Sequence, residues 1–365
     1  MNVLIYRIGQ LGDTLVALPA IRAVRQHYPR AKIGLLCDSH PEKSYVLSAD
    51  LLRPSGLVDH FETYPILSGR CQGLLKPFHA LSLLVRLRSR TYDILVYLAP
   101  SDRSPEQVRR DKLFFQAAGI KEFVGMTGFV ANPNPENVIP LPRVMHEADQ
   151  LMSRLALSGV SVPPPGQGCM DLNFTEDEEA EFGSWVKSLP TSNQRVWVGF
   201  GPGSKMPAKK WSITRYEEVG HELIRQYDIW PVIFGGTEDI EVGNQLLEAW
   251  GRGYNAAGKL GLRAAGYALK QCALYLGNDT GTMHLAAAAG TRCVAIFSAR
   301  DWPGKWDPYG FGHKVLRTSL ECEGCRLTAC VERKNECLNR VFPKDVIAGA
   351  RAILAEDRSG IAVHS

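Results

Sequence analysis

A chain of 365 residues with 45% hydrophobic and 22% charged residues has a globular composition, and it is too long for one ordinary core, so we expect two domains. The chain has 42 lysines and arginines against 38 aspartates and glutamates. This small excess of positive charge argues against nucleic acid as the partner, whereas an anionic small-molecule ligand stays possible. The N-terminus lacks a signal-peptide pattern and no apolar run could span a bilayer, so we expect a cytoplasmic protein.

The first half of the chain predicts alternating strands and helices. An apolar run over 3–6 is followed by a turn with Gly9 and Gly12, and then by apolar residues at three-residue spacing over 15–24. Pro19 interrupts this helical pattern and is a residue that kinks helices. Further strands are expected at 32–37, 94–98 and 123–125. This alternation favours a parallel α/β sheet.

A second unit of the same kind is expected after the proline- and glycine-rich stretch VPPPGQG at 162–168. Thr175 and Glu178 have the spacing of a capping box, which predicts the start of a helix. The expected strands and helices follow in order: strands at 196–200, 231–234, 273–276 and 293–297, and helices at 214–227 and 282–289. The predicted domains are 1–165 and 166–345, followed by a C-terminal helix and tail over 346–365.

Ligands of open α/β sheets gather where strands end, so the turns after strands are the places to look for a site. The first such turn, Gly9 to Thr14, has glycines that let the backbone approach a ligand, and Asp13 stands at the start of the following helix. Asp13 could equally be an ordinary helix cap, because aspartate is favoured there. The glycine pair falls short of a full dinucleotide-binding pattern.

A second turn, GNDTGTMH at 277–284, follows a predicted strand and opens an alanine-rich helix. Free backbone N–H groups at a helix start, together with the helix dipole, favour an anion such as a diphosphate. Taken singly, Asp279 could be a cap and His284 a buried histidine with ordinary partners. Their clustering in one turn favours a functional site.

A third candidate is the loop GPGSKMPAKKW at 201–211, which follows the strand expected at 196–200 and carries Lys205, Lys209 and Lys210. A lysine in such a loop can offset the charge of a phosphate. The alternative is a solvated basic loop with no ligand.

Five segments of the chain together resemble glycosyltransferase family 9, the heptosyltransferases. They are NVLIYRIGQLGDTLVALPAIRAVRQHYPRAKIGLL, GSKMPAKKW, FGGTED, GNDTGTMHLAAAAGT and CEGCRLTACVERKNECLNRVFP, and they cover nearly the whole chain in order. The resemblance implies a GT-B fold, in which two Rossmann-like domains face each other across a cleft. In that fold the final helix often crosses back to the first domain.

The same resemblance implies a role for individual residues. Asp13 matches the general base, and Asp279 matches a contact to the donor sugar or diphosphate. Either Glu238 or Asp239 falls where the family has an acidic residue that holds the nucleoside. The remaining implied donor-nucleotide contacts are Lys209, Thr280, Gly281 and His284. ADP-heptose is the donor that the family implies, although other nucleotide sugars stay open.

These residue types suit an inverting sugar transfer. The reaction needs a carboxylate to take the proton of the attacking acceptor hydroxyl, and positive or N–H groups to stabilise the departing diphosphate. Asp13 supplies the first need, whereas Lys209 and the N–H groups near Thr280 supply the second. The sequence contains no Asp-x-Asp triplet of the metal-using type, so we expect catalysis without a divalent ion or other cofactor.

Four of the nine cysteines form a pattern C-x2-C-x4-C-x6-C, namely Cys322, Cys325, Cys330 and Cys337. In a reducing cytoplasm a structural zinc site is one interpretation and free thiols are the other, while disulfides are disfavoured. The family resemblance adds iron as an alternative metal. The five scattered cysteines are expected in the core: Cys37, Cys71, Cys169, Cys272 and Cys293.

The acceptor is expected at the first domain. Arg103, Arg109, Arg110 and Lys112 follow the strand expected at 94–98, where an anionic lipopolysaccharide core or another glycan or protein acceptor could dock, although an exposed helix face explains them equally well. Such an acceptor would imply peripheral contact with the inner membrane. Two rival functions share the two-domain plan, a sugar-nucleotide epimerase and a nucleotide-binding protein without catalysis.

Overall fold

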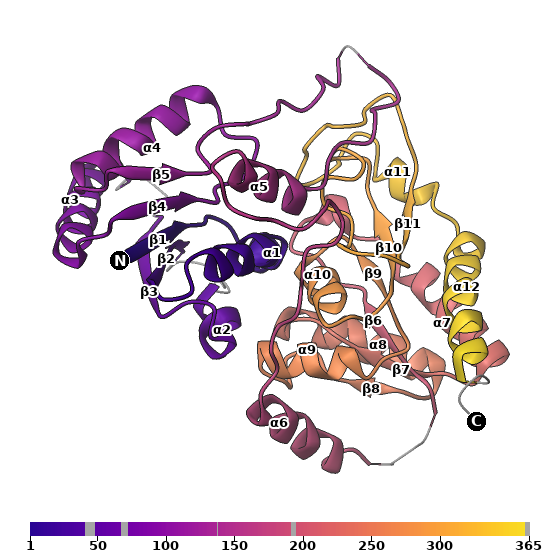
Figure 1. The fold of residues 1–365 in the computed structure, drawn as a ribbon. Helices are drawn as coiled ribbons and strands as arrows, with labels where there is room; N and C mark the ends of the chain where they lie inside the picture. Colours follow the sequence, from indigo (N-terminus) through magenta and orange to yellow (C-terminus); the bar gives the residue numbers. More distant parts are fainter. Residues whose placement is uncertain (41–47, 67–71, 137, 191–194, 362–365) are drawn as a thin grey trace. The chain divides into compact units, whose positions relative to one another are not determined.

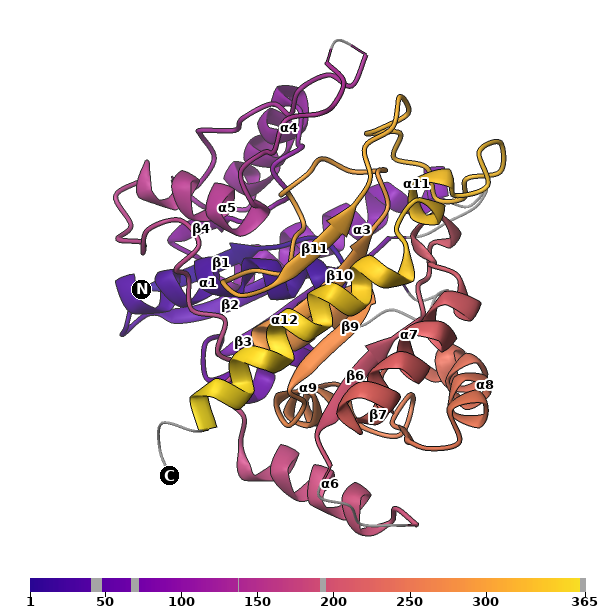
Figure 2. The same ribbon diagram turned by 90° about the vertical axis from the view of Figure 1, so that its right-hand side faces the viewer.

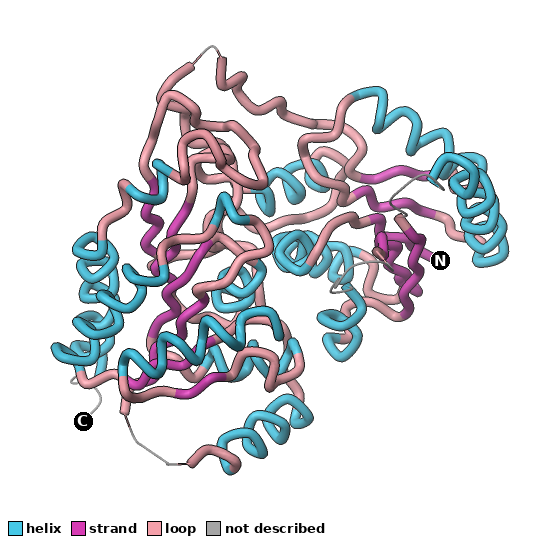
Figure 3. Tube along the Cα trace, turned by 180° about the vertical axis from the view of Figure 1, so that it is seen from behind, coloured by secondary structure: helices cyan, strands magenta, loops and turns pink. Residues whose placement is uncertain are grey.

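The computed structural model describes residues 1–40, 48–66, 72–136, 138–190 and 195–361, and it divides into two compact units (Figure 1). The first unit comprises Met1–Asn132 and Met145–Cys169, and the second comprises Pro133–Val144 and Met170–Ser365. Within each unit the strands form one layer flanked by helices (Figure 3). No helix within the described residues is long and apolar enough to cross a membrane.

The sheet of the first unit is entirely parallel, with strand order β3-β2-β1-β4-β5. Its strands are β1 (Asn2–Tyr6), β2 (Lys32–Ser39), β3 (His60–Pro65), β4 (Ile94–Tyr97) and β5 (Glu122–Val124). Its helices are α1 (Leu11–His27), α2 (Ser48–Leu52), the 3-10 turn η1 (Arg53–Ser55), α3 (Gln72–Arg90), α4 (Pro105–Ala117) and α5 (Glu147–Ala156).

The strands predicted in this half are confirmed, and one further strand was not foreseen. Strand β3 lies at the edge of the sheet and most of its residues are only half-buried, so its sequence has little of the apolar signal on which prediction depends. Helix α1 continues through Pro19, whose side chain is buried within the unit.

The second unit has a parallel sheet with strand order β11-β10-β9-β6-β7-β8. Its strands are β6 (Trp197–Gly201), β7 (Trp230–Ile233), β8 (Tyr254–Asn255), β9 (Leu274–Asn278), β10 (Cys293–Phe297) and β11 (Lys314–Arg317). Its α-helices are α6 (Glu176–Lys187), α7 (Ile213–Tyr227), α8 (Ile240–Trp250), α9 (Leu262–Lys270), α10 (Gly281–Ala288), α11 (Glu336–Asn339) and α12 (Pro343–Ile361). Two 3-10 turns, η2 (Pro207–Lys209) and η3 (Thr237–Asp239), follow β6 and β7.

The four strands predicted in this half are confirmed, whereas the short edge strands β8 and β11 were not foreseen. The expected capping box is also present, because the backbone N–H of Thr175 donates to the Glu178 carboxylate over 2.6 Å at the start of α6. Arg263 of α9 pairs with the same buried carboxylate. This pair fastens α6 to α9 beside the sheet.

The two units are not separated by a single boundary between residues 165 and 166, as the sequence predicted. The segment Pro133–Val144 precedes that boundary in the chain but belongs to the second unit. The indole N–H of Trp302 donates to the carbonyl of Pro133 over 2.8 Å, and the buried Glu323 accepts the N–H of Leu141 over 2.9 Å. This segment has no helical or strand pattern in the sequence. Only its tertiary contacts show that it belongs to the second unit.

The C-terminal helix α12 belongs to the second unit. It packs against α7 and contacts β9, β10 and β11, and Figure 2 shows it in yellow beside these strands. Its residues Val346, Ala350 and Ile353 are fully buried in the core of that unit.

The scattered cysteines follow the prediction only in part. Cys37, Cys272 and Cys293 are buried free thiols, as expected. Cys169 is exposed, so its assignment to the core was wrong, because it lies at the end of the irregular stretch where the first unit ends. Cys71 lies outside the described residues.

Candidate active site

Each sheet has one point where the strand order reverses, between β1 and β4 in the first unit and between β6 and β9 in the second. Such a switch point opens a crevice at the carboxyl ends of the strands, and ligands of doubly wound folds bind there. The candidate residues of the sequence follow these strand ends. We therefore describe one candidate site in each unit.

Asp13 lies in the first turn of α1, directly after β1 and its connecting turn. The cap of this helix is Gln10, and the Asp13 carboxylate accepts the backbone N–H of Gln10 over 2.9 Å. Asp13 is thus the third residue of the helix. The alternative interpretation of the sequence, that Asp13 is the cap of this helix, is wrong. Its side chain is still 30% exposed, so it can meet a ligand.

Arg7 stands directly beneath this carboxylate and was not singled out in the sequence. Its side chain has no exposed surface, and Nη2 lies 3.6 Å from Oδ1 of Asp13. Nη1 donates to the carbonyl of Leu98 over 2.7 Å, while Nε and Nη2 make no hydrogen bond. The available signal was a charged residue immediately after the apolar run over 3–6.

The charge state of Asp13 reflects opposing influences. Burial among the surrounding atoms raises the pKa of its carboxyl, whereas the Arg7 guanidinium and the N–H of Gln10 act to lower it. The carboxylates of Glu147 and Asp38 add to the increase. The net result is a pKa above the usual value, in a side chain that is still partly open to solvent.

Gly9 is required for this arrangement of Asp13. Its φ of +120° belongs to a region that other residues rarely adopt, and a Cβ at this position would lie 2.4 Å from Cγ of Asp13. The N–H of Gly9 donates to the buried carboxylate of Asp38 over 2.8 Å, which holds the turn against the end of β2. The role of this glycine is thus to make room for the carboxylate.

The loop around Lys209 in the second unit is held by Ala208 before it and by Trp211 two positions after it. Ala208 is buried and its N–H donates to the carbonyl of Thr328 over 3.0 Å. Trp211 is also buried, and its indole N–H donates to the carbonyl of Val341 over 3.1 Å. The loop after β6 is therefore fixed on both sides of Lys209, unlike a solvated basic loop.

Lys209 and Asp279 are brought together by β6 and β9. Nζ of Lys209 lies 2.6 Å from Oδ2 of Asp279, and both side chains are largely buried. Asp279 therefore pairs with the lysine and does not cap α10, whose cap residue is Thr280. The pair places a cation and an anion side by side at the switch point of this sheet.

Asn278, at the end of β9, was missed as a site residue although it lies inside the GNDTG segment. Its amide group donates to the carbonyl of Pro202 over 2.8 Å, and its carbonyl accepts the N–H of Trp211 over 3.2 Å. The hydroxyl of Tyr216 donates to the same carbonyl over 3.0 Å. Asn278 thus joins the lysine loop to β9 from a fully buried position.

Helix α10 begins at Gly281 and has Thr280 at its cap. His284 is buried within its first turn, one turn away from the cap. The free N–H groups at the start of this helix follow directly on Asp279, so they lie near the Lys209 pair in the fold. Lys209, Asp279 and the start of α10 are thus neighbours in the fold, and their role in binding a donor stays a prediction.

Two acidic neighbours, Glu238 and Asp239, differ in their setting after β7. Asp239 is half-buried and accepts the N–H of Gly236 over 3.0 Å, whereas Glu238 is exposed. A Cβ on Gly203 would lie 2.0 Å from Oδ1 of Asp239, so this carboxylate touches the loop that carries Lys209. Burial raises the pKa of Asp239, while Lys205 and Lys210 act to lower it.

The basic residues proposed for the acceptor lie at the start of α4 and on its surface. Arg103 and Arg110 both approach the buried carboxylate of Asp111, at 3.9 Å and 2.8 Å. Arg109 and Lys112 are exposed. The structure thus groups Arg103 and Arg110 around one carboxylate, and their contact with an acceptor stays a prediction.

The four cysteines of the tail lie between β11 and α12 as free thiols. Burial raises the pKa of Cys322, and the nearby thiols of Cys325 and Cys330 raise it further. Among the described residues, however, no three His, Cys, Asp or Glu side chains converge as metal ligands would. The thiols are neighbours, but their present arrangement does not fit a bound metal.

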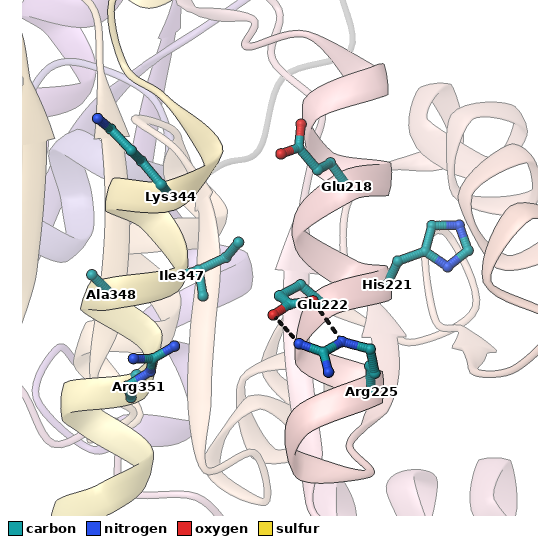
Figure 4. Close-up of a pocket in the computed structure, with 8 residues that line it drawn as sticks. All are labelled: Glu218, His221, Glu222, Arg225, Lys344, Ile347, Ala348 and Arg351. Carbon is teal, nitrogen blue, oxygen red and sulfur yellow. Dashed lines mark hydrogen bonds and ion pairs between the residues drawn. The ribbon is translucent and has the colours of Figure 1, made fainter.

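A surface groove between α7 and α12 contains none of the candidate residues (Figure 4). Glu222 and Arg225 pair over 2.6 Å on its α7 side, and Lys344 and Arg351 line its α12 side. This groove lies on helices rather than at the carboxyl ends of the strands, so it is separate from the candidate site.

Comparison with known sequences assigns the chain to a family. A profile of glycosyltransferase family 9 (heptosyltransferase) matches residues 145–335, which is more than half of the chain. The chain belongs to glycosyltransferase family 9. The family match covers Lys209, Asp279 and the start of α10, whereas Asp13 lies outside the matched range.

Named relatives within this family support the same assignment. The chain is 30% identical over 190 residues to lipopolysaccharide heptosyltransferase 2 of Escherichia coli, covering 50% of this chain and 53% of that protein. It is 29% identical over 188 residues to the protein of the same name from Salmonella typhimurium, covering 49% and 53%. The matched part thus spans about half the length of these curated relatives.

Two solved structures share the fold over nearly the whole chain. The E. coli ADP-heptose lipopolysaccharide heptosyltransferase II matches with a TM-score of 0.68 and 22% identity, covering 98% of this chain and 100% of the other. The family 9 glycosyltransferase of Veillonella parvula matches with a TM-score of 0.72 and 19% identity, covering 97% of both chains. The predicted α/β fold with two Rossmann-like units is confirmed.

Proposed function

We propose that this protein is an inverting glycosyltransferase that moves heptose from ADP-heptose to a lipopolysaccharide-core or related glycan acceptor. The observation that carries the proposal is the placement of an accessible carboxylate, Asp13, at one switch point and of the Lys209–Asp279 pair at the other. Its relatives are named lipopolysaccharide heptosyltransferases, which supports heptose and lipopolysaccharide as the substrates.

In this proposal the donor binds the second unit. Lys209 and the N–H groups at the start of α10 receive the diphosphate, because both offer positive charge to an anion. Asp279 orients Lys209 through the ion pair made by its Oδ2, and its other carboxylate oxygen contacts the sugar in this proposal. Asp239 is the better of the two acidic candidates for the nucleoside, since it touches the Lys209 loop and Glu238 is exposed.

Asp13 acts as the general base in the transfer step. The acceptor oxygen attacks the anomeric carbon and loses its proton to the Asp13 carboxylate, while the bond from that carbon to the diphosphate breaks. ADP departs with the electron pair of that bond, and Lys209 stabilises its developing negative charge. A side-chain cation and helix N–H groups meet this need, so the proposed step uses no divalent ion.

The acceptor binds the first unit in this proposal, next to Asp13. Arg103 and Arg110 are candidates for contacts with its anionic groups, since both lie near the carboxyl end of β4. A lipid-linked acceptor would bring the enzyme to a membrane surface.

The test is a transfer assay with purified chain, ADP-heptose and a heptose-deficient lipopolysaccharide acceptor. We expect Asp13→Asn to lower kcat by about a hundredfold or more, as for other lost general bases, with donor affinity nearly unchanged. The amide oxygen of asparagine can still accept the N–H of Gln10, so the helix start is preserved in this variant.

Two outcomes would contradict the proposal. Full activity of Asp13→Asn would remove Asp13 from the mechanism. Conversion of the sugar nucleotide without an acceptor would instead indicate an epimerase, so an acceptor-free reaction is run beside each assay.

A further inference from the structure

Helix α3 has apolar side chains on two opposite faces. Leu83 and Leu87 are buried in the core of the first unit. On the other side Phe78, Leu81 and Val85 are 72%, 58% and 59% exposed. These three residues, the α3 stripe, are spaced by three and four positions, so they share one face of the helix.

Exposing an apolar stripe to water costs free energy. A contiguous exposed apolar patch often marks an interaction site, whereas single exposed apolar residues do not. Isolated exposed apolar residues are common, but three in register on one helical face form a continuous surface. The face opposite the core is normally the polar face of a surface helix. The α3 stripe is therefore a candidate interaction surface.

The charge around the stripe narrows the choice of partner. The sequence of α3 contains no aspartate or glutamate, and Arg86, Arg88 and Arg90 are exposed near its C-terminal end. Arg86 and Arg90 approach the buried carboxylate of Glu62 at 3.9 Å and 3.2 Å. Three arginines against one carboxylate leave the C-terminal end of α3 with a net positive charge.

We propose that the α3 stripe and its arginines form a docking surface for an anionic lipid membrane. A helix that combines a cationic side with exposed phenylalanine and leucine matches the chemistry of helices that lie in the membrane interface. Arginine side chains extend to lipid phosphates while their stems lie along apolar surface. Arg88, three positions after Val85, stands on the same face as the stripe.

A second copy of the chain fits this surface less well. A two-fold contact through the α3 stripe would pair two helices that carry arginines but no aspartate or glutamate, so neither copy of α3 offers the other a counter-charge. Anionic lipids neutralise these arginines instead. This inference deepens the proposed function and rests on it for the lipid-linked acceptor that would bring the enzyme to a membrane. Docking itself needs neither the sugar donor nor the acceptor, so it is tested separately.

The experiment is sedimentation of the full chain with lipid vesicles, in the absence of any sugar substrate. One set of vesicles contains phosphatidylcholine alone and the other also contains phosphatidylglycerol. The main variant is Phe78→Gln with Leu81→Gln and Val85→Gln, since glutamine is polar and favours helices. Arg88→Glu is a second variant, which tests the charge without altering the stripe.

Phe311→Gln is the matched control, because Phe311 is 75% exposed in the second unit. We expect the chain and this control to bind the anionic vesicles, more weakly as salt increases. The stripe variant should lose at least about tenfold in binding, and Arg88→Glu should lose several-fold. Circular dichroism and the Tm confirm that each variant is folded.

Three results would overturn the proposal. The stripe variant could bind anionic vesicles as well as the control does, or the chain could bind neutral vesicles equally well. The stripe variant could also convert a dimer to a monomer in light scattering without any loss of vesicle binding, which would identify a second copy as the partner. Because the transfer assay is separate, each result leaves the proposed catalytic function unaffected.

Discussion

Arg7 and Asp13 form an ion pair in which the cation is fully buried and the anion is partly exposed, with 3.6 Å between Nη2 and Oδ1. Arg7 does not reach a ligand directly, because its side chain has no exposed surface. Its guanidinium therefore acts on the reaction through Asp13. A buried cation beside a carboxyl group favours the ionised carboxylate, which is the form that accepts a proton.

This relationship predicts the pH dependence of the reaction. Asp13 must be ionised, so kcat/KM falls as the pH falls through its pKa. Burial raises this pKa, so the decline begins at a higher pH than for an exposed aspartate. Because Arg7 acts to lower the same pKa, Arg7→Met should move the decline to still higher pH.

Two variants control the Arg7 measurement. Arg7→Lys retains the positive charge and should restore most of the original profile. Arg25→Met removes an arginine that pairs with Asp59 at 2.7 Å, and it should leave the profile unchanged. An Arg7→Met enzyme that is folded and has an unaltered acid limb would exclude this role for Arg7.

Gly9→Ala should impair both stability and catalysis. Its positive φ costs roughly 1–3 kcal/mol for a residue with a side chain, and the added methyl group would collide with the Asp13 carboxylate. We expect a lower Tm and at least about a tenfold loss of kcat, since a displaced base no longer meets its proton.

Gly56→Ala is the control for backbone strain alone. Gly56 also has a positive φ, of +70°, but a Cβ there would have no atom within 4 Å. This variant should lose about 1 kcal/mol of stability and keep its activity. Equal activity losses in the two variants would show that the space beside Asp13 is not what Gly9 provides.

Lys209→Ala should weaken ADP binding by at least about tenfold, the scale of one lost charge-assisted hydrogen bond. The substitution also leaves Asp279 without its cation next to the proposed diphosphate, which adds repulsion. His284→Ala should weaken ADP binding as well, while acceptor binding changes less in both variants. Isothermal calorimetry measures these affinities.

Lys210→Ala is the matched control, because Lys210 is the exposed neighbour of Lys209 in the same loop. It should change ADP affinity by much less than Lys209→Ala does. Equal effects of the two substitutions would favour a diffuse basic loop over the specific Lys209–Asp279 pair.

The cysteine tail gives a separate prediction. If Cys322, Cys325, Cys330 and Cys337 move together around a metal, protein purified without chelators under reducing conditions should contain about one zinc or iron per chain. Iron is named beside zinc because the family resemblance of the sequence implies it as the alternative metal. Cys322→Ser with Cys325→Ser should release the metal and lower the Tm.

Cys169→Ser controls for the loss of an exposed thiol outside the tail. It should leave both the metal content and the Tm unchanged. Elemental analysis that finds no metal in the purified chain would leave free thiols as the state of the tail, in agreement with their present arrangement.

The two Rossmann-like units and most of their strands could be predicted from the sequence. Buried parallel strands are apolar on both faces, so β1, β6 and β10 stand out as short apolar runs. Edge strands have a weaker pattern, which is why β3, β8 and β11 were not predicted. The site-bearing turns were found because each directly follows a strand.

By itself the sequence determined where Asp13, Lys209 and Asp279 lie along the chain, because strand ends and helix starts are local features. Only the tertiary structure decided which of them meet. Lys209 and Asp279 pair because β6 and β9 are neighbours in the sheet, although 70 positions separate these two residues in the chain. The role of Arg7 also depends on the tertiary structure. Its burial next to Asp13 results from the packing of β1 against β4.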